Sequence, residues 1–273
     1  MTAAVWSFVK LAGLSVLLAE AAARLGGGSL GFWDRRSRGP LGRFGLGYLL
    51  GLGLTGPALL GLALTGLYAP ALVAALLVLM LAGSRDSWRR ESVVLSAWRA
   101  LRGRLPPEGA AFLALAAVPG LYALLVPEGE QDAFIYHLGL PWQWLEARRA
   151  VLTWVPAAFH LALPVDLGFT IPLLLGDDRL AKWMIWWHFW AATAVFLGVW
   201  RERAPERAPG SWLGTALVLT TGQSIGTVMV LMTRSKNDVA AAAFFVAGAL
   251  LARKRAWALG AVLLGMAVAA KQV

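Results

Sequence analysis

The sequence predicts an all-α, polytopic integral membrane protein with about eight transmembrane helices. Of its 273 residues, 59% are hydrophobic and only 15% are charged, whereas about 25% are charged in ordinary soluble domains. Apolar runs of about 20 residues recur along the chain, and that is the length a helix needs to cross a bilayer. One soluble core of this size could not bury so many apolar residues, so we expect a bundle of membrane helices.

The basic residues indicate how these helices are oriented. Most of the 25 Lys and Arg lie in short connections between apolar runs, as in the cytoplasmic loops of membrane proteins. The connections expected in the cytoplasm are 34–43, 85–104, 201–210 and 252–255. The predicted spans are 3–25, 44–66, 69–83, 109–126, 181–200, 211–232, 239–252 and 256–271. The net charge of +10 then matches anionic lipid, and we expect no nucleic-acid partner.

The first apolar segment allows two interpretations. Ala21–Ala23 looks like the cleavage site of a secretory signal. The arginine-rich residues 34–43 follow directly, and translocating them would violate the positive-inside rule, which favours an uncleaved first span. Lys10 and Glu20 lie inside this span, so we expect them to reach the interface or to face other helices.

Residues 1–108 are predicted to form an N-terminal unit of transmembrane helices with a cytoplasmic amphipathic segment. Within the basic stretch 85–104, five residues share a helical face, namely Trp88, Val94, Leu95, Trp98 and Leu101. That pattern is typical of an interfacial helix. Its plain role is membrane anchoring, and contact with a phosphorylated lipid is the alternative.

Residues 109–273 are predicted to form a second unit, whose outer loop spans 127–180. This loop contains apolar patches interrupted by prolines but no clean span, so we expect one or two juxtamembrane helices. Glu128, Glu130 and Asp132 lie where the span 109–126 ends. Asp132 is well placed to act as a general base on an acceptor hydroxyl or amine at the membrane surface. The alternative is a solvated loop acid, and we expect Glu128 and Glu130 to be solvated or lipid-surface acids.

Several other polar residues have competing interpretations. His137 and His160 are candidate ligands or proton carriers, whereas His188 lies in an apolar span and is expected to be packed or hydrogen-bonded. Asp238 is a candidate site residue, but on its own it reads better as a cap of the helix that begins near residue 239. Asp177-Asp178 invite the same capping interpretation for the span at 181–200.

Motif searches narrow the cofactor classes. There is no HExxH motif, so no protein-bound zinc is expected. A carboxylate-bound Mg²⁺ or Mn²⁺ is compatible with the sequence, although no spacing specifies one. The phosphate-binding loop and the dinucleotide fingerprint are both missing, which speaks against soluble nucleotide chemistry. There are 0 cysteines, which excludes disulfides and thiolate metal sites.

Several motifs, taken in order, carry a resemblance to a known superfamily. They are Asp132-Ala-Phe-Ile-Tyr-His-Leu-Gly-Leu-Pro141 with Trp144-Leu-Glu146, Trp154-Val-Pro156 with Phe159-His160 and Pro164, Gly176-Asp-Asp-Arg-Leu-Ala-Lys182, Ser235-Lys-Asn-Asp238, and Ala269-Ala-Lys271. Together they resemble GT-C membrane glycosyltransferases, in particular bacterial members similar to glycosyltransferase family 39 and the protein O-mannosyltransferases. The first motif resembles the outer-loop stretch in which an acid precedes a YHLxLPxxWLExG-like sequence.

This resemblance implies a function and a set of site residues. It implies transfer of a hexosyl or pentosyl unit from a polyprenyl-phosphate-linked donor to an acceptor lipid, glycan or protein. Transfer would occur with inversion on the extracytoplasmic side of a membrane, here expected to be a bacterial inner membrane. It implies Asp132 as the catalytic base. The residues it places in the substrate-binding region are Tyr136, His137, His160, Asp238 and Lys271.

The sequence also departs from the family pattern. Asp132 is followed by Ala133 where the family commonly has a second acid, and residues 1–104 precede the usual start of the fold. Further helices normally complete the donor cavity, so we expect this chain to be the N-terminal portion of the enzyme, truncated at its C-terminus. The alternatives are a non-catalytic membrane protein, such as a transporter or assembly partner, and an inactive fragment of the same fold.

Overall fold

A computed structural model describes residues 3–33, 39–84, 91–102, 126–129, 131, 133–151, 163–203 and 237–270. Within these ranges the regular elements are helices and there is no strand, which confirms the predicted all-α class. Two of the described helices contain stretches long and apolar enough to cross a membrane, Val5–Gly28 and Pro40–Leu64. The predicted spans 109–126, apart from residue 126, and 211–232 lie outside the described residues, and eight spans are not confirmed.

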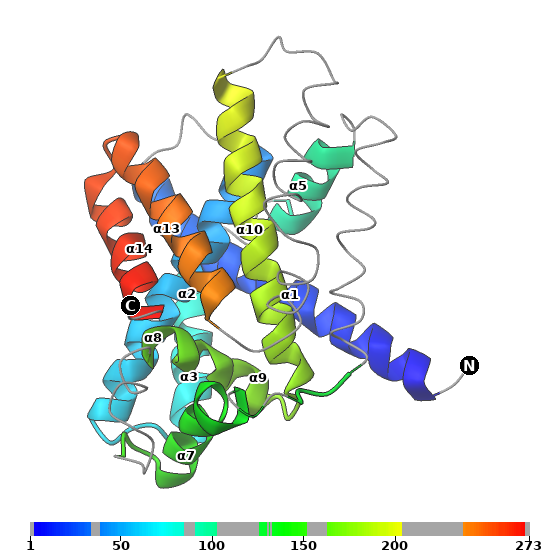
Figure 1. The fold of residues 1–273 in the computed structure, drawn as a ribbon, viewed down its shortest axis with the longest axis vertical. Coiled ribbons are helices and arrows are strands. Elements are labelled where there is room, and N and C mark those ends of the chain that lie inside the picture. Colours follow the sequence, from blue (N-terminus) through cyan, green and yellow to red (C-terminus); the bar gives the residue numbers. More distant parts are fainter. Residues whose placement is uncertain are drawn as a thin grey trace.

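Figure 1 shows the order of the elements along the chain. They are α1 (Ala3–Trp33), α2 (Pro40–Leu64), α3 (Pro70–Gly83), α5 (Val93–Arg102), the π-helical turn η1 (Ala133–His137), α7 (Gly139–Ala147), α8 (Leu163–Asp166), the 3₁₀ turn η3 (Leu167–Phe169), α9 (Thr170–Leu174), α10 (Arg179–Arg203), α13 (Asp238–Arg253) and α14 (Trp257–Ala270). Helices α3 and α14 have 14 residues each, fewer than the about 20 that a full span requires.

Proline and glycine set the boundaries of the first helices. Pro40 and Pro70 stand in the first turns of α2 and α3, where a missing backbone N–H costs nothing. Helix α2 continues through Pro57, so the Gly56-Pro57 pair does not end it. The chain turns after α2 at Gly66, whose φ of 75° is a left-handed conformation that glycine adopts without strain.

Helix α2 is the centre of the packing. It crosses α1 and α10 closely, and its neighbours also include α5 and α8. A Cβ atom on Gly51 would lie 2.0 Å from the carbonyl oxygen of Ala22 in α1, so only glycine allows this approach. Small residues at such crossings are typical of membrane helix pairs. One apolar core then joins α1, α2, α5, α10, α13 and α14.

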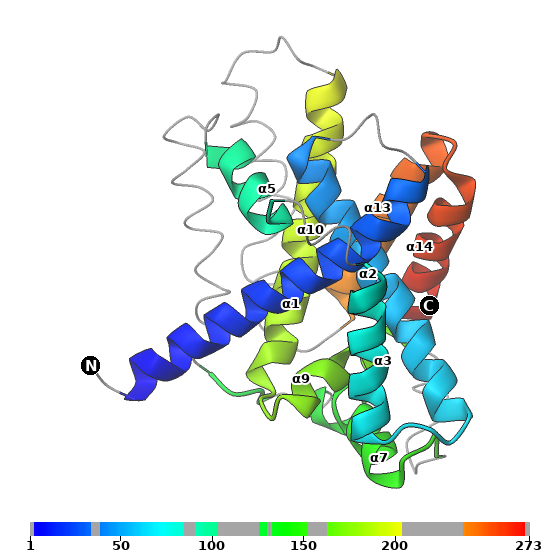
Figure 2. The same cartoon turned by 180° about the vertical axis from the view of Figure 1, so that it is seen from behind.

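The two ends of the bundle differ in character. Helices α7, α8 and α9 lie together at one end, which is the lower end in Figure 1. The C-terminal end of α10 and the turn between α13 and α14 lie at the other end, and that turn carries the exposed residues Arg253, Lys254 and Arg255. Helix α1 crosses the bundle obliquely, as Figure 2 shows from behind.

The apolar face predicted for the amphipathic segment is divided between the protein core and the surface. In α5, Ala97 and Leu101 are buried against the core, whereas Leu95 is 42% and Trp98 is 55% exposed. Successive helical residues are about 100° apart, so Leu95, Trp98 and Leu101 still fall within about 120° on one side of the helix. Helix α5 therefore buries one edge of this face against the protein and leaves the other edge, with Leu95 and Trp98, exposed. Trp88 lies outside the described residues.

Candidate functional site

Three segments that are distant in sequence meet at one buried point. His137 ends η1, Asp166 ends α8, and Asn237 directly precedes α13. His137 Nδ1 lies 2.8 Å from Asp166 Oδ1, and Asn237 Nδ2 donates a hydrogen bond of 2.7 Å to the same oxygen. All three residues are buried, and Asp166 is 0% exposed. We call these three residues the Asp166 cluster.

Local backbone geometry explains why these residues meet. In η1 the N–H of Leu138 donates to the carbonyl of Ala133 at 2.8 Å, which widens the turn by one residue relative to an α-helix. A Cβ at Gly139 would lie 2.2 Å from the carbonyl oxygen of Phe134, so the close backbone approach at the end of this turn requires glycine. The turn places His137 in the interior, although Phe134, three residues earlier, is exposed.

A second close approach positions Asp166. A Cβ on Gly56 in α2 would lie only 1.9 Å from the carbonyl oxygen of Pro164, so α8 rests directly on the α2 backbone. Below it, the Thr170 and Tyr68 hydroxyls form a buried hydrogen bond that ties the start of α9 to the α2–α3 connection. Asp166 is thus held between α2 and the turn that contains His137.

The contacts of Asp166 do not fully offset the cost of burying its charge. Burial raises the pKa of its carboxyl above the ordinary value, and the contacts with His137 and Asn237 oppose that shift only in part. Among the described residues, Asp166 Oδ2 and Asn237 Oδ1 have no hydrogen-bond partner. Buried acceptors without a donor are rare because each costs about 1–3 kcal/mol. The cluster therefore has spare capacity to accept hydrogen bonds or a proton.

A separate set of contacts fixes the start of the outer loop. The buried ammonium group of Lys182 in α10 donates to the carbonyls of Val126 and Pro127, the latter at 3.1 Å. The backbone N–H of Glu128 donates to Asp178 Oδ2 at 2.8 Å. These bonds hold residues 126–129, a few residues before position 132, against the first turn of α10.

These contacts bear on the predicted solvation of Glu128 and on the predicted capping of α10 by Asp177 and Asp178. Glu128 is only 6% exposed, so its predicted solvation is wrong, because the bond to Asp178 draws this segment onto the protein. Asp177 Oδ1 accepts the N–H of Arg179 at 3.0 Å, which confirms capping by Asp177. Asp178 instead binds the loop.

The predicted site residues have different outcomes. His137 lies in the cluster. Tyr136 lies in η1, but its side chain is outside the described part of the structure, as are Asp132, His160 and Lys271 as whole residues. Asp238 is the first residue of α13 rather than its N-cap, and a carboxylate there favours the helix dipole. Its neighbour Asn237, not Asp238, binds Asp166.

His188 is packed and hydrogen-bonded, as the sequence predicts. Its Nδ1 lies 2.7 Å from the carbonyl oxygen of Met184, and its ring stands between those of Tyr48 and Phe244. The predicted role as an interior residue is confirmed.

Sequence reasoning missed Asp166 and Asn237. The signal for Asp166 is its isolation, because it is the one acid in the apolar stretch 161–175. An ionisable residue in such a stretch is a candidate functional residue by default. Asn237 carries no comparable signal, since an asparagine before a helix usually reads as a cap.

The described residues contain no group of three or more His, Cys, Asp or Glu side chains that could hold a metal ion. A half-enclosed cavity of about 90 Å³ lies between α1, α2, α3, α9 and α10. Its lining is apolar, and it is smaller than the about 300–1,000 Å³ of typical ligand pockets. The Asp166 cluster is therefore the strongest candidate site in the described structure.

A scan against protein-family models finds no match, and comparisons with curated proteins and with solved structures find none either. The resemblance to GT-C glycosyltransferases thus rests on the order of the sequence motifs alone.

Proposed function

We propose that this chain is the membrane-embedded part of a glycosyltransferase. It transfers a hexosyl or pentosyl unit from a polyprenyl-phosphate-linked donor to an acceptor lipid, glycan or protein at the extracytoplasmic face. The observation that carries the proposal is the buried cluster of His137, Asp166 and Asn237. It joins two of the motifs of the resemblance, the one that begins at Asp132 and the one that ends at Asp238.

The two ends of the bundle support the proposed orientation. With α1 and α2 across the membrane, the basic turn at residues 253–255 marks the cytoplasmic end by the positive-inside rule. Helices α7, α8 and α9 lie at the opposite end (Figure 1), and the proposal gives this end, with the Asp166 cluster, to the extracytoplasmic side. The proposed location in a bacterial inner membrane rests on the sequence resemblance.

The proposed reaction is an inverting displacement at the anomeric carbon. The acceptor oxygen forms a bond to that carbon, the bond from carbon to the phosphate oxygen breaks, and the polyprenyl phosphate leaves with the electron pair. Asp132 takes the acceptor proton, a role that contributes about 10²–10⁴-fold in rate. A divalent metal, Mg²⁺ or Mn²⁺, is an option that the reaction allows and does not require.

His137 has a positioning role in this proposal. When its Nδ1–H donates to Asp166, the neutral imidazole has its acceptor lone pair on Nε2. Asn237 holds the same carboxylate oxygen from the other side, which limits rotation of Asp166. The ring is thereby fixed in one tautomer, five residues after Asp132 in the loop.

The direct test replaces Asp132 with Asn in the protein reconstituted in liposomes with a polyprenyl-phosphate sugar and an extracted acceptor pool. We expect sugar transfer to fall by about 10²-fold or more, since the general base is lost. Glu91→Gln is the matched control, because Glu91 is exposed, lies outside the motifs of the resemblance and pairs with the exposed Arg99. Unchanged transfer by Asp132→Asn would refute the base assignment.

A non-catalytic role, as a transporter or assembly partner, is the second candidate. The observation that favours it is the buried ion pair between Glu20 and Arg24 within the candidate span Val5–Gly28. Ionisable groups inside spans often mark transport paths. In that case neutralising Glu20 would abolish transport, whereas replacing Asp132 or His137 would leave transport unchanged.

A further inference from the structure

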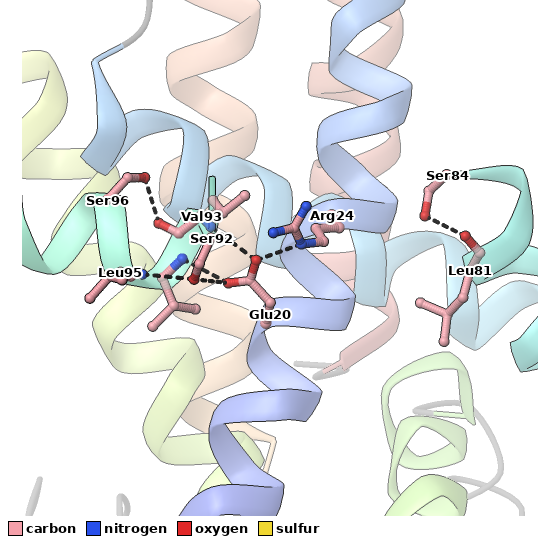
Figure 3. A network of polar contacts seen from close by, with 9 residues as sticks. Glu20, Arg24, Leu81, Ser84, Ser92, Val93, Leu95 and Ser96 are labelled. Atoms are coloured by element: carbon pink, nitrogen blue, oxygen red, sulfur yellow. Dashed lines mark hydrogen bonds and ion pairs between the residues drawn. The ribbon is translucent and has the colours of Figure 1, made fainter. Parts of the chain in front are cut away.

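Helix α5 is held in place by a carboxylate from another helix. Glu20 of α1 accepts hydrogen bonds from the backbone N–H groups of Val93 and Val94, each at 2.9 Å. Ser92 Oγ also donates to Glu20 at 2.9 Å, and Arg24 Nε pairs with it at 2.5 Å (Figure 3). The free N–H groups at the start of α5 are therefore capped from α1, and the carboxylate charge favours that end of the helix dipole.

This cap decides which face of α5 stays open. Ala97 and Leu101 pack on the core, and the adjoining exposed side presents Trp98, Leu95, Arg99 and Arg102. Trp98 is 55% and Leu95 is 42% exposed, and both arginines are exposed, Arg99 beside the carboxylate of Glu91 with which it pairs. Large apolar residues beside arginine on one open face are typical of helices that lie in a membrane interface.

The position of α5 in the bundle indicates the chemistry of its partner. It lies in the same half of the molecule as the α13–α14 turn, with its exposed basic residues 253–255, as both views show. Arg43, near the start of α2, is exposed as well. A surface of this charge complements the anionic headgroups of the cytoplasmic leaflet.

We propose that α5 is an in-plane helix that binds anionic phospholipid. Trp98 and Leu95 enter the boundary between headgroups and acyl chains, and Arg99 and Arg102 bind the lipid phosphates. Glu20 sets the position of α5 relative to the spanning helix α1. This lipid-binding role does not depend on glycosyl transfer and requires only that α1 crosses the membrane.

The test uses the natural lack of cysteine, since the chain contains 0 Cys. Trp98→Cys and Leu95→Cys, each as the one cysteine, are labelled with an environment-sensitive fluorophore in the full chain in nanodiscs. The discs contain either phosphatidylcholine alone or equal parts phosphatidylcholine and phosphatidylglycerol. Quenching by phospholipids brominated on their acyl chains is compared with quenching by aqueous iodide.

We expect the brominated lipid to quench both labels in the anionic discs and iodide to quench them little. Quenching by lipid is expected to fall at least about twofold in pure phosphatidylcholine or with Arg99→Gln/Arg102→Gln, because the attraction to the headgroups is lost. The matched control is Arg148→Gln/Arg149→Gln, two exposed arginines after α7, which leaves the signal unchanged. All these side chains are exposed, so the variants retain the fold.

Three results would overturn the proposal. Strong iodide quenching in both kinds of disc would place α5 in water. Protection from both quenchers would show that protein covers this face. Lipid quenching that depends neither on the anionic lipid nor on the two arginines would show that α5 does not bind anionic headgroups.

Discussion

Two buried carboxylates, Glu20 and Asp166, differ in how their oxygens are used. Each oxygen of Glu20 accepts two hydrogen bonds, from Arg24 and Val93 on one side and from Ser92 and Val94 on the other. Asp166 receives both of its contacts on Oδ1, and Oδ2 has no partner among the described residues.

This difference separates a structural acid from a functional one. A buried charge with its hydrogen bonds satisfied joins helices, because any change leaves donors unpaired. A buried acid can bind or release a proton when one of its oxygens lacks a hydrogen-bond partner and the other contacts a histidine. Glu20 therefore joins α1 to α5, and the proposed function gives Asp166 the role of orienting His137.

The largest expected effect is on stability, from Glu20→Ala. The change leaves Arg24 buried without this partner and removes the cap of α5, so the free energy of unfolding should fall by about 3–5 kcal/mol. Denaturant unfolding in detergent micelles measures it. Lys10→Ala is the control, since Lys10 lies in the same helix and is exposed. Equal losses in the two variants would remove the distinction drawn for Glu20.

The next effect is on activity, from His137→Gln. Glutamine keeps a polar group near Asp166 but removes the imidazole ring that the cluster positions, so transfer is expected to fall about 100-fold. Unfolding stability should change by about 1 kcal/mol, the value of one hydrogen bond. Transfer kinetics and denaturant unfolding on the same preparation provide both numbers. If His137→Gln loses stability but keeps its transfer rate, the Asp166 cluster has a structural role and no part in transfer.

Lys182→Met tests whether the anchored start of the loop matters. The methionine fills similar space but cannot donate to the carbonyls of Val126 and Pro127, so stability should fall by about 1.5–3 kcal/mol. The transfer rate should fall too, since residues 126–129 precede Asp132. Arg179→Gln, at the surface end of the same helix turn, is the comparison. A normal rate in Lys182→Met would show that the loop does not need this anchor.

The smallest effect is a pH dependence from Asp166. Burial raises its pKa, so the folded protein keeps the Asp166 proton to higher pH than the unfolded chain. Its contribution to stability is complete below the ordinary Asp pKa and is lost as pH rises through the raised pKa. The stability of Asp166→Asn relative to the wild type should therefore increase with pH across that window. Denaturant midpoints measured across acidic to neutral pH provide the test, and a constant difference would contradict it.

The helix positions could be predicted from sequence because they depend on local patterns. Apolar length and flanking basic residues placed helices at 44–66, 69–83, 181–200 and 239–252, and the structure has them at Pro40–Leu64, Pro70–Gly83, Arg179–Arg203 and Asp238–Arg253. The expectation that Glu20 faces another helix is confirmed, and Lys10 is exposed.

The site was less predictable because it depends on tertiary contacts. The meeting of His137 with Asp166 requires the π-helical turn before Leu138 and the close approach of Pro164 to Gly56. Neither has a period or motif that sequence inspection detects. The burial of Glu128 likewise follows from its contact with Asp178, fifty residues away. Asp132 is adjacent to η1 in sequence, and its role stays a prediction.

The most direct test of the account is the initial rate of sugar transfer by Asp166→Asn in liposomes that contain the polyprenyl-phosphate donor. Asparagine has nearly the same shape and cannot carry the charge that orients His137. We predict a rate at least about tenfold below the wild type, with an unfolding midpoint at neutral pH that is equal or higher. A wild-type rate in this folded variant would contradict the assignment of the Asp166 cluster to glycosyl transfer.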